Sequence, residues 1–169
     1  NSVHFKSEPV RYSRIKSPIE LVIGTLKLAQ EFEFPNINII DASRAIGYMG
    51  QQLLNPPSVE GWHEGLEWLD SGTLVERVNF ASKYLGDSNR PCVDTIVSEF
   101  RNQKIAGITV NEIVETCLNQ LGYIYINEST KLNILEGLYL KYPDAKDNIR
   151  QIATDAMRLI VSSKEFQMA

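Results

Sequence analysis

Apolar residues recur along this chain with the spacing of an α-helix. The clearest case is residues 110–121, where apolar positions follow one another at intervals of three or four residues: Val110, Ile113, Val114, Cys117, Leu118 and Leu121. Before this stretch, Thr109 and Glu112 have the spacing of a capping box, and Gly122 after it is a natural helix stop. The pattern predicts an amphipathic helix with one buried face.

A second helix start is Ser17-Pro18-Ile19-Glu20, which adds proline at the first helical position to the capping-box spacing. This helix is predicted to run to about Phe32 and to be buried on more than one side, because its apolar face is broad. The same criteria predict further helices at residues 41–54, 72–85, 93–102, 130–141 and 146–163. Asp41 and Ser71 are the predicted N-caps of the first two, and Gly86 closes the helix over 72–85.

Strand signals are scarce in comparison. Residues 36–40 and 123–126 alternate briefly between apolar and polar positions, and each run is short enough to be an extended linker. The sequence therefore predicts an all-α fold, a single irregular bundle of about six or seven helices with a proline-rich turn that holds both tryptophans. Residues 1–16 are expected to form a flexible basic start and residues 17–169 the helical domain, with a soft boundary near residues 86–92.

The most distinctive local sequence is the run Asn55-Pro56-Pro57-Ser58-Val59-Glu60-Gly61-Trp62, which Trp68 follows. Paired prolines beside a glycine fix the direction of the chain, so Trp62 is expected to insert against the helices predicted at residues 17–32 and 72–85. Large aromatic residues next to a proline turn are typical of a small satellite core. An alternative interpretation is a sugar-binding platform formed by Trp62, Trp68 and Tyr48.

Composition and charge exclude some functional classes. The chain has 169 residues and a formal net charge of −4, so it lacks the basic field of most nucleic-acid-binding domains, and no nucleic-acid partner is expected. No apolar run approaches the ~20 residues that cross a bilayer, so membrane insertion is not expected. Cys92 and Cys117 do not make a disulfide framework, and Cys117 is predicted to be a small buried thiol.

The acidic stretch over residues 60–70 contains three candidate metal ligands, His63, Glu64 and Glu67, because histidine and carboxylates on one helical face can hold a divalent cation. Glycines interrupt the stretch, however, and the second histidine of the His-Glu-x-x-His zinc motif is missing. A solvated acidic loop is the other interpretation, and no cofactor is expected. Arg77 could bind an anion or pair with an acidic residue of the loop, such as Glu60 or Asp70.

Four motifs follow one another along the chain in a recognisable order. They are Lys16-Ser17-Pro18-Ile19-Glu20, the Gly-Gln-x-Leu…Pro-Pro-x-Val-x-Gly-Trp run over residues 50–62, Trp68 with the Leu-x-x-Arg motif from Leu74 to Arg77 in the helix predicted at 72–85, and the Glu-Phe-Gln ending over residues 165–167. This order resembles the later part of the bacterial domain-of-unknown-function family 1800. One departure is His63-Glu64-Gly65, which stands where the family has Pro-Gly-Gly and so counts against His63 as a metal ligand.

The resemblance implies that this chain is the C-terminal helical part of a larger bacterial protein, often exported to the periplasm or the cell surface. It supplies no catalytic residues. The expected partner is the N-terminal portion of the same protein or another protein. The motif residues form the candidate interaction surface: Gln51, Pro56, Pro57, Val59, Gly61, Trp62, Trp68 and Arg77.

A helical structural or interaction domain is the preferred interpretation, and two other functions stay open. One is the C-terminal part of an enzyme whose active site is shared with the N-terminal portion, which requires a cleft with Glu60, His63 and Arg77 directed inward. The other is a glycan-binding module, which requires exposed, coplanar rings of Trp62 and Trp68. Closed, dry packing of the two tryptophans would favour the structural or interaction domain.

Overall fold

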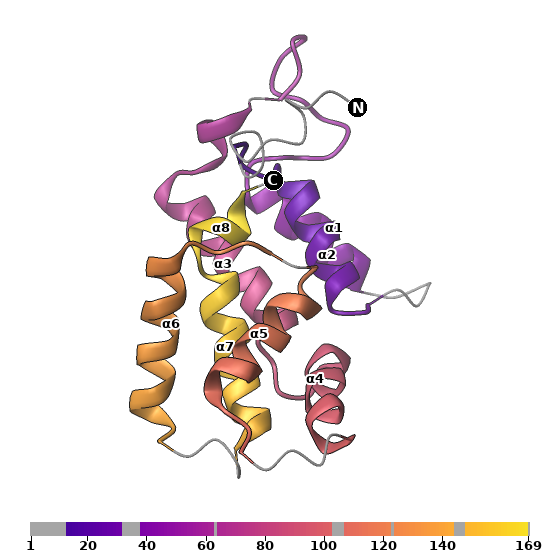
Figure 1. The fold of residues 1–169 in the computed structure, drawn as a ribbon. Coiled ribbons are helices and arrows are strands. Elements are labelled where there is room, and N and C mark those ends of the chain that lie inside the picture. The colour runs from indigo at the N-terminus through magenta and orange to yellow at the C-terminus, as the bar shows by residue number, and fades with distance from the viewer. Residues whose placement is uncertain are drawn as a thin grey trace, which may run out of the picture.

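The computed structural model describes residues 13–31, 38–62, 64–102, 107–122, 124–143 and 148–168. Within these ranges the chain forms eight α-helices, one short 3-10 helix and no strand (Figure 1). The predicted all-α fold is therefore confirmed. In chain order the helices are α1 (Pro18–Leu28), α2 (Asn38–Tyr48), η3 (Gly65–Trp68, the 3-10 helix), α3 (Ser71–Leu85), α4 (Pro91–Asn102), α5 (Val110–Gln120), α6 (Glu128–Lys141), α7 (Ile149–Val161) and α8 (Lys164–Gln167).

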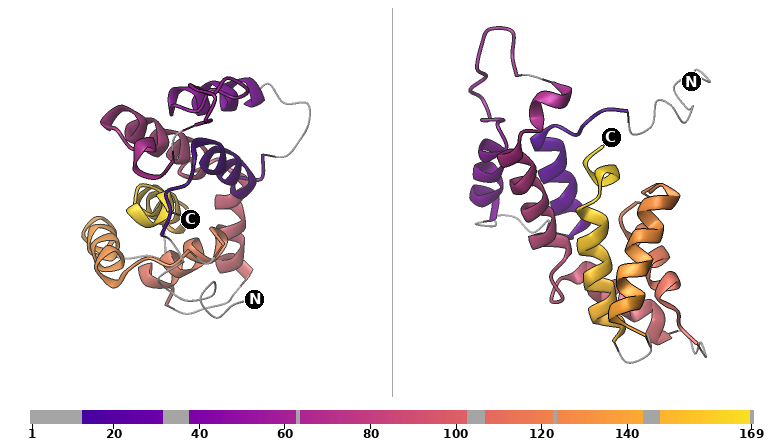
Figure 2. Two further views of the ribbon diagram at one scale, coloured as in Figure 1. Left: turned by 90° about the horizontal axis from the view of Figure 1, so that it is seen from above. Right: turned by 90° about the vertical axis from the view of Figure 1, so that its left-hand side faces the viewer.

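Helix α7 lies at the centre of the bundle, where it packs against α3, α4, α5 and α6 (Figure 2). Its inward positions follow the helical spacing and are all buried: Ile152, Ala153, Ala156, Met157, Ile160 and Val161. Helix α5 buries the predicted apolar stripe, and burial raises the pKa of the Cys117 thiol within it. Helices α1 and α2 pack against α3 and against each other, and so extend the bundle on one side.

Both predicted capping boxes form. The amide of Glu20 donates to Ser17 Oγ at 3.4 Å, and the amide of Ser17 donates to Glu20 Oε2 at 2.8 Å. Thr109 and Glu112 make the same reciprocal pair at 3.2 and 2.8 Å. These local hydrogen bonds fix the first turns of α1 and α5 at the residues that the sequence predicts.

Helix α1 ends earlier than predicted. The amide of Glu31 donates to the Leu26 carbonyl at 3.0 Å, and Gln30 adopts a left-handed φ of 62°. This turn closes the helix, so that Leu28 is its last residue. The sequence predicts a longer helix because the left-handed position holds glutamine instead of glycine. Phe32, the predicted end, lies outside the described residues.

Helix α2 is shifted toward the N-terminus relative to its prediction. It begins at Asn38, so Asp41 lies within its first turn and is not its N-cap. It ends at Tyr48 because Gly50 adopts a φ of 93° and closes the helix well before the prolines. The predicted end, Leu54, therefore lies in the turn that follows.

Other boundaries move by a few residues. Asp70, not Ser71, is the N-cap of α3, whereas Gly86 is its C-cap as predicted. The alternating runs over 36–40 and 123–126 form no strand in their described parts, and residues 38–40 belong to α2. Residues 1–12 of the predicted flexible start lie outside the described residues. From Ile15 onward that segment is packed, since Ile15 is buried and pairs with Met168.

Candidate functional site

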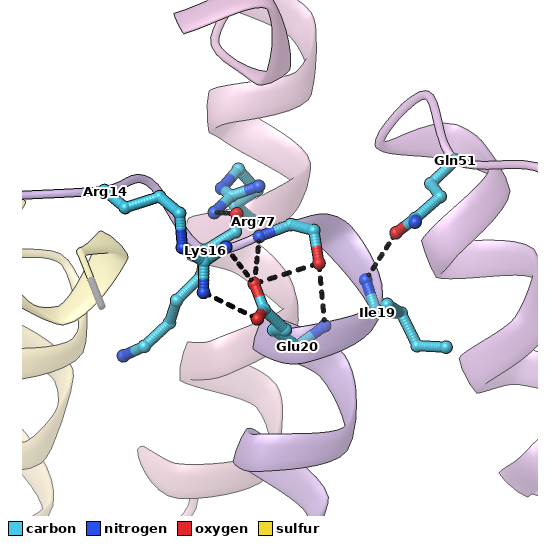
Figure 3. A network of polar contacts seen from close by, with 7 residues as sticks. Arg14, Lys16, Ile19, Glu20, Gln51 and Arg77 are labelled. Carbon is cyan, nitrogen blue, oxygen red and sulfur yellow. Dashed lines mark hydrogen bonds and ion pairs between the residues drawn. The ribbon is translucent and has the colours of Figure 1, made fainter. Parts of the chain in front are cut away.

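The motif residues from distant parts of the sequence meet at one end of the bundle. Lys16 and Glu20 flank the start of α1, Gln51 follows α2, Arg77 lies on α3 and Gln167 ends α8. Figure 3 shows the part of this network that connects the start of α1 with Gln51 and Arg77. The site therefore brings together the beginning and the end of the described chain.

Arg77 is the centre of this network. Its side chain has no exposed surface. Nε donates to Gln167 Oε1 at 2.9 Å and Nη2 donates to the Lys16 carbonyl at 2.6 Å, while Nη1 has no hydrogen-bond partner among the described residues. Burial lowers the pKa of the guanidinium to about 10. The expected pairing with Glu60 or Asp70 is wrong, because Arg77 faces neutral acceptors inside the fold.

Lys16 adds a second cation to the same place. Its amide donates to the Gln167 carbonyl at 2.9 Å, and its Nζ donates to the Phe166 carbonyl at 2.7 Å. Nζ also lies 4.8 Å from the centroid of the Phe166 ring. Burial and then the charge of Arg77 lower the pKa of Lys16 to about 8. Neither cation forms an ion pair with a carboxylate in the described ranges.

On the outer side of the network, a carboxylate is paired with a cation. Glu20 accepts hydrogen bonds from both terminal nitrogens of Arg14 at 2.7 and 2.8 Å, and from Ser17. The Arg14 hydrogen bonds are the largest cause of a Glu20 pKa of about 2. Gln51 Oε1 accepts from the Ile19 amide at 2.9 Å, which attaches the turn after α2 to the first turn of α1.

A cleft of about 700 Å³ adjoins this network on the side of the proline-rich turn. The segment before α1 and the residue Gln51 line one part of it, and the turn and η3 line the rest: Arg14, Ile15, Ser17 and Gln51, then Glu60, Trp62, Glu64, Gly65 and Trp68. The cleft is open to solvent. It places the acidic side chains of the turn opposite the segment that leads into α1.

The two tryptophans have different surroundings. Trp68 is only 6% exposed and packs close to Gly50. Trp62 is half-buried in the wall of the cleft, and its Nε1 has no acceptor among the described residues. Trp62 is thus less buried than Trp68, and its expected insertion against the helices predicted at residues 17–32 and 72–85 stays a prediction. Tyr48, the third member of the predicted platform, is 70% exposed and lines a separate hollow on α2.

The proline-rich turn projects beyond the helices, as Figure 1 and Figure 2 show. Pro56 and Pro57 are exposed, and Val59 at the tip is fully exposed. The Gly61 amide donates to the Ser58 carbonyl at 3.2 Å, and Gly61 has a φ of 105°, which favours glycine at this position. Pro56, Pro57 and Val59 thus face solvent, whereas Gln51, Trp68 and Arg77 of the same predicted surface are buried.

The candidate metal ligands lie beside the cleft. Glu64 is the residue before η3 and Glu67 lies within η3, and both are exposed. His63 lies outside the described residues. Within the part of the chain that the structure describes, no three histidine, cysteine or acidic side chains come together as a metal site would require.

Sequence reasoning did not identify Lys16 and Gln167 as members of the site. Both residues belong to the sequence motifs at the two ends of the chain, and this membership is the one sequence feature that could have identified them. Their role depends on contacts with Arg77 across 61 and 90 residues, which periodicity and capping rules do not address.

Comparison with family models places the chain in a family. The model described as "Protein of unknown function (DUF1800)" matches residues 1–168, so the chain belongs to this family. Comparison with curated proteins and with solved structures gives no match. Among the described helices, none combines the length and apolar character needed to cross a membrane.

Proposed function

We propose that this chain is an interaction domain, which binds another polypeptide surface through the turn over residues 51–62. The observation that carries this proposal is the exposure of apolar side chains on a rigid turn. Leu54 is 98% exposed and Val59 is fully exposed, and paired prolines between them restrict the backbone. These side chains contribute no burial to this domain, whereas a partner that covers them would gain hydrophobic free energy.

The surroundings of the turn support the same function. Further exposed apolar side chains follow on its flanks: Tyr48, Leu53, Leu66, Leu74 and Val75. Exposed apolar side chains that gather on one surface are typical of a protein-binding site. The favoured partner is the N-terminal portion of the same protein, because the family resemblance implies a longer chain.

The two alternatives receive less support from the geometry. A shared active site requires Arg77 in the cleft, but Arg77 is buried and bonded to Gln167 and Lys16 on the other side of the wall. A glycan platform requires two exposed rings, but Trp68 is only 6% exposed. The polypeptide-binding surface needs neither condition.

Photo-crosslinking in the cell that naturally makes the protein tests the proposal. A photoreactive phenylalanine derivative is introduced at Val59, and the crosslinked segment is identified by mass spectrometry. The matched control carries the same residue at Leu132 on α6, which is 59% exposed. We expect one defined segment, of the same chain or of one other protein, from position 59 only. The product should disappear when Leu54→Asp is added, and identical products from both positions would refute the proposal.

A further inference from the structure

The exposed side chains that line the cleft beside the turn include two carboxylates, and the Trp62 Nε1 donor in its wall has no partner among the described residues. Arg14 lines the cleft, but both of its terminal nitrogens already donate to Glu20. The carboxylates of Glu60 and Glu64 also line it and are exposed, and neither forms a hydrogen bond or an ion pair within the described ranges, although the charge of Glu64 acts on Arg14 and, after the hydrogen bond from Arg14 to Glu20, contributes to the raised pKa of that guanidinium. Residues 60–70 contain four acidic side chains and no lysine or arginine. The open groups of the cleft therefore favour a ligand that donates hydrogen bonds and carries positive charge.

An aromatic wall accompanies the carboxylates. Trp62 is half-buried and lies between Glu60 and Glu64 in the sequence, and the buried Trp68 lines the same cleft. The face of an indole ring attracts an ammonium or guanidinium group, and this attraction adds to that of nearby carboxylates. A neutral sugar would also stack on an indole and could donate hydroxyl hydrogen bonds to the carboxylates, but it carries no positive charge to complement their two negative charges.

We propose that the cleft binds a lysine or arginine side chain on an apolar segment of a partner polypeptide. The cation would lie between Glu60, Glu64 and the Trp62 ring, and the neighbouring apolar residues of that segment would cover Leu54 and Val59. This inference rests on the proposed function and specifies the chemistry of the partner. The negative charges of the cleft favour a cationic side chain, and the exposed apolar tip of the turn favours apolar residues next to it in the partner sequence.

A random heptapeptide display library, selected on the purified chain, is the probe for this site. The comparison uses wild type, the double variant Glu60→Gln and Glu64→Gln, and a control double variant, Glu99→Gln and Glu136→Gln. The control removes the same charge from exposed positions on α4 and α6, far from the turn in Figure 1. Binding of the selected peptides is then measured by tryptophan fluorescence, because both tryptophans of the protein line the cleft.

We expect wild type and the control to select peptides rich in lysine or arginine, and the Glu60/Glu64 variant to bind them at least about tenfold more weakly. Binding should also weaken as salt is added. Selection of peptides without basic residues, or of none, would overturn the inference. A fluorescence change with neutral oligosaccharides alone would overturn it in favour of glycans. If crosslinking at Val59 succeeds while the Glu60/Glu64 variant binds normally, the interaction surface stands and the cation site fails.

Discussion

The half-buried lysine of the network should make the stability of this protein rise with pH in the alkaline range. Lys16 has a folded-state pKa of about 8, against an ordinary lysine value of 10.5, because burial and then the charge of Arg77 lower it. Between these two values the unfolded chain holds more protons than the folded one. Stability therefore increases as pH rises through this window, and the unfavourable contribution of Lys16 is fully present below pH 8.

The size of this effect has a clear upper bound. The difference between a pKa of about 8 and the ordinary value of 10.5 corresponds to about 3 kcal/mol of unfolding free energy. Two contacts reduce it, because the Phe166 carbonyl and ring both favour the charged ammonium group. Lys16 is also only half-buried. We therefore expect a gain of about 1–2 kcal/mol between pH 8 and pH 10.

Urea denaturation at a series of pH values measures this gain when wild type is compared with two variants. Lys16→Met removes the charge, and Lys16→Arg keeps it through the whole range. Neither variant should show the alkaline gain, so the difference between wild type and each variant should change by about 1–2 kcal/mol across the window. Other titrating groups are common to all three proteins and cancel in this difference. Parallel curves would refute the assignment of Lys16 as a buried cation.

Three further predictions concern stability. Trp68→Ala should lower the unfolding free energy by about 3–5 kcal/mol, as large core truncations do, whereas Trp62→Ala should lower it by only about 1–2 kcal/mol. Equal losses of stability in thermal melts of the two variants would contradict the difference in burial. Gly86→Ala should destabilise by about 1–3 kcal/mol, because its Cβ would lie 2.9 Å from a backbone carbonyl oxygen, while Gly137→Ala in α6 has open space and should stabilise by about 1 kcal/mol. Arg77→Met should speed amide hydrogen exchange at both ends of the described chain by removing two buried hydrogen bonds, and unchanged exchange would argue against its connecting role.

Local signals predicted helix starts well because the relevant hydrogen bonds join residues three positions apart. The capping boxes at Ser17 and Thr109 are of this kind, and both form. The end of α1 was not predictable in the same way. It depends on Gln30 in a left-handed conformation, which the surrounding packing imposes on a residue that does not prefer it.

The partners of Arg77 show why the site was harder to predict than the fold. Asp70 is close in sequence, but its Oδ1 already accepts hydrogen bonds from two amides at the start of α3. Glu60 lies on the exposed turn, whereas Arg77 lies on the buried face of α3. The sequence shows which charged residues are present. Which of them can pair depends on the face of α3 that carries Arg77 and on the role of Asp70 as the N-cap. These choices belong to tertiary structure.

The network and the cleft share one short segment, and this links the interior of the site to its surface. Within residues 14–17, Arg14 and Ser17 line the cleft, while Lys16 faces the interior and is bonded to Gln167 and Arg77. Buried cations without carboxylate partners contribute little net stability. The network therefore matters for where it holds the backbone and not for the free energy that it adds. By donating to the carbonyl of Lys16, Arg77 anchors the backbone of the segment that lines the cleft. Substitution of Arg77 should consequently change binding at the cleft as well as stability, although it does not touch the ligand, and the peptides selected on wild type offer a direct measure of that coupling.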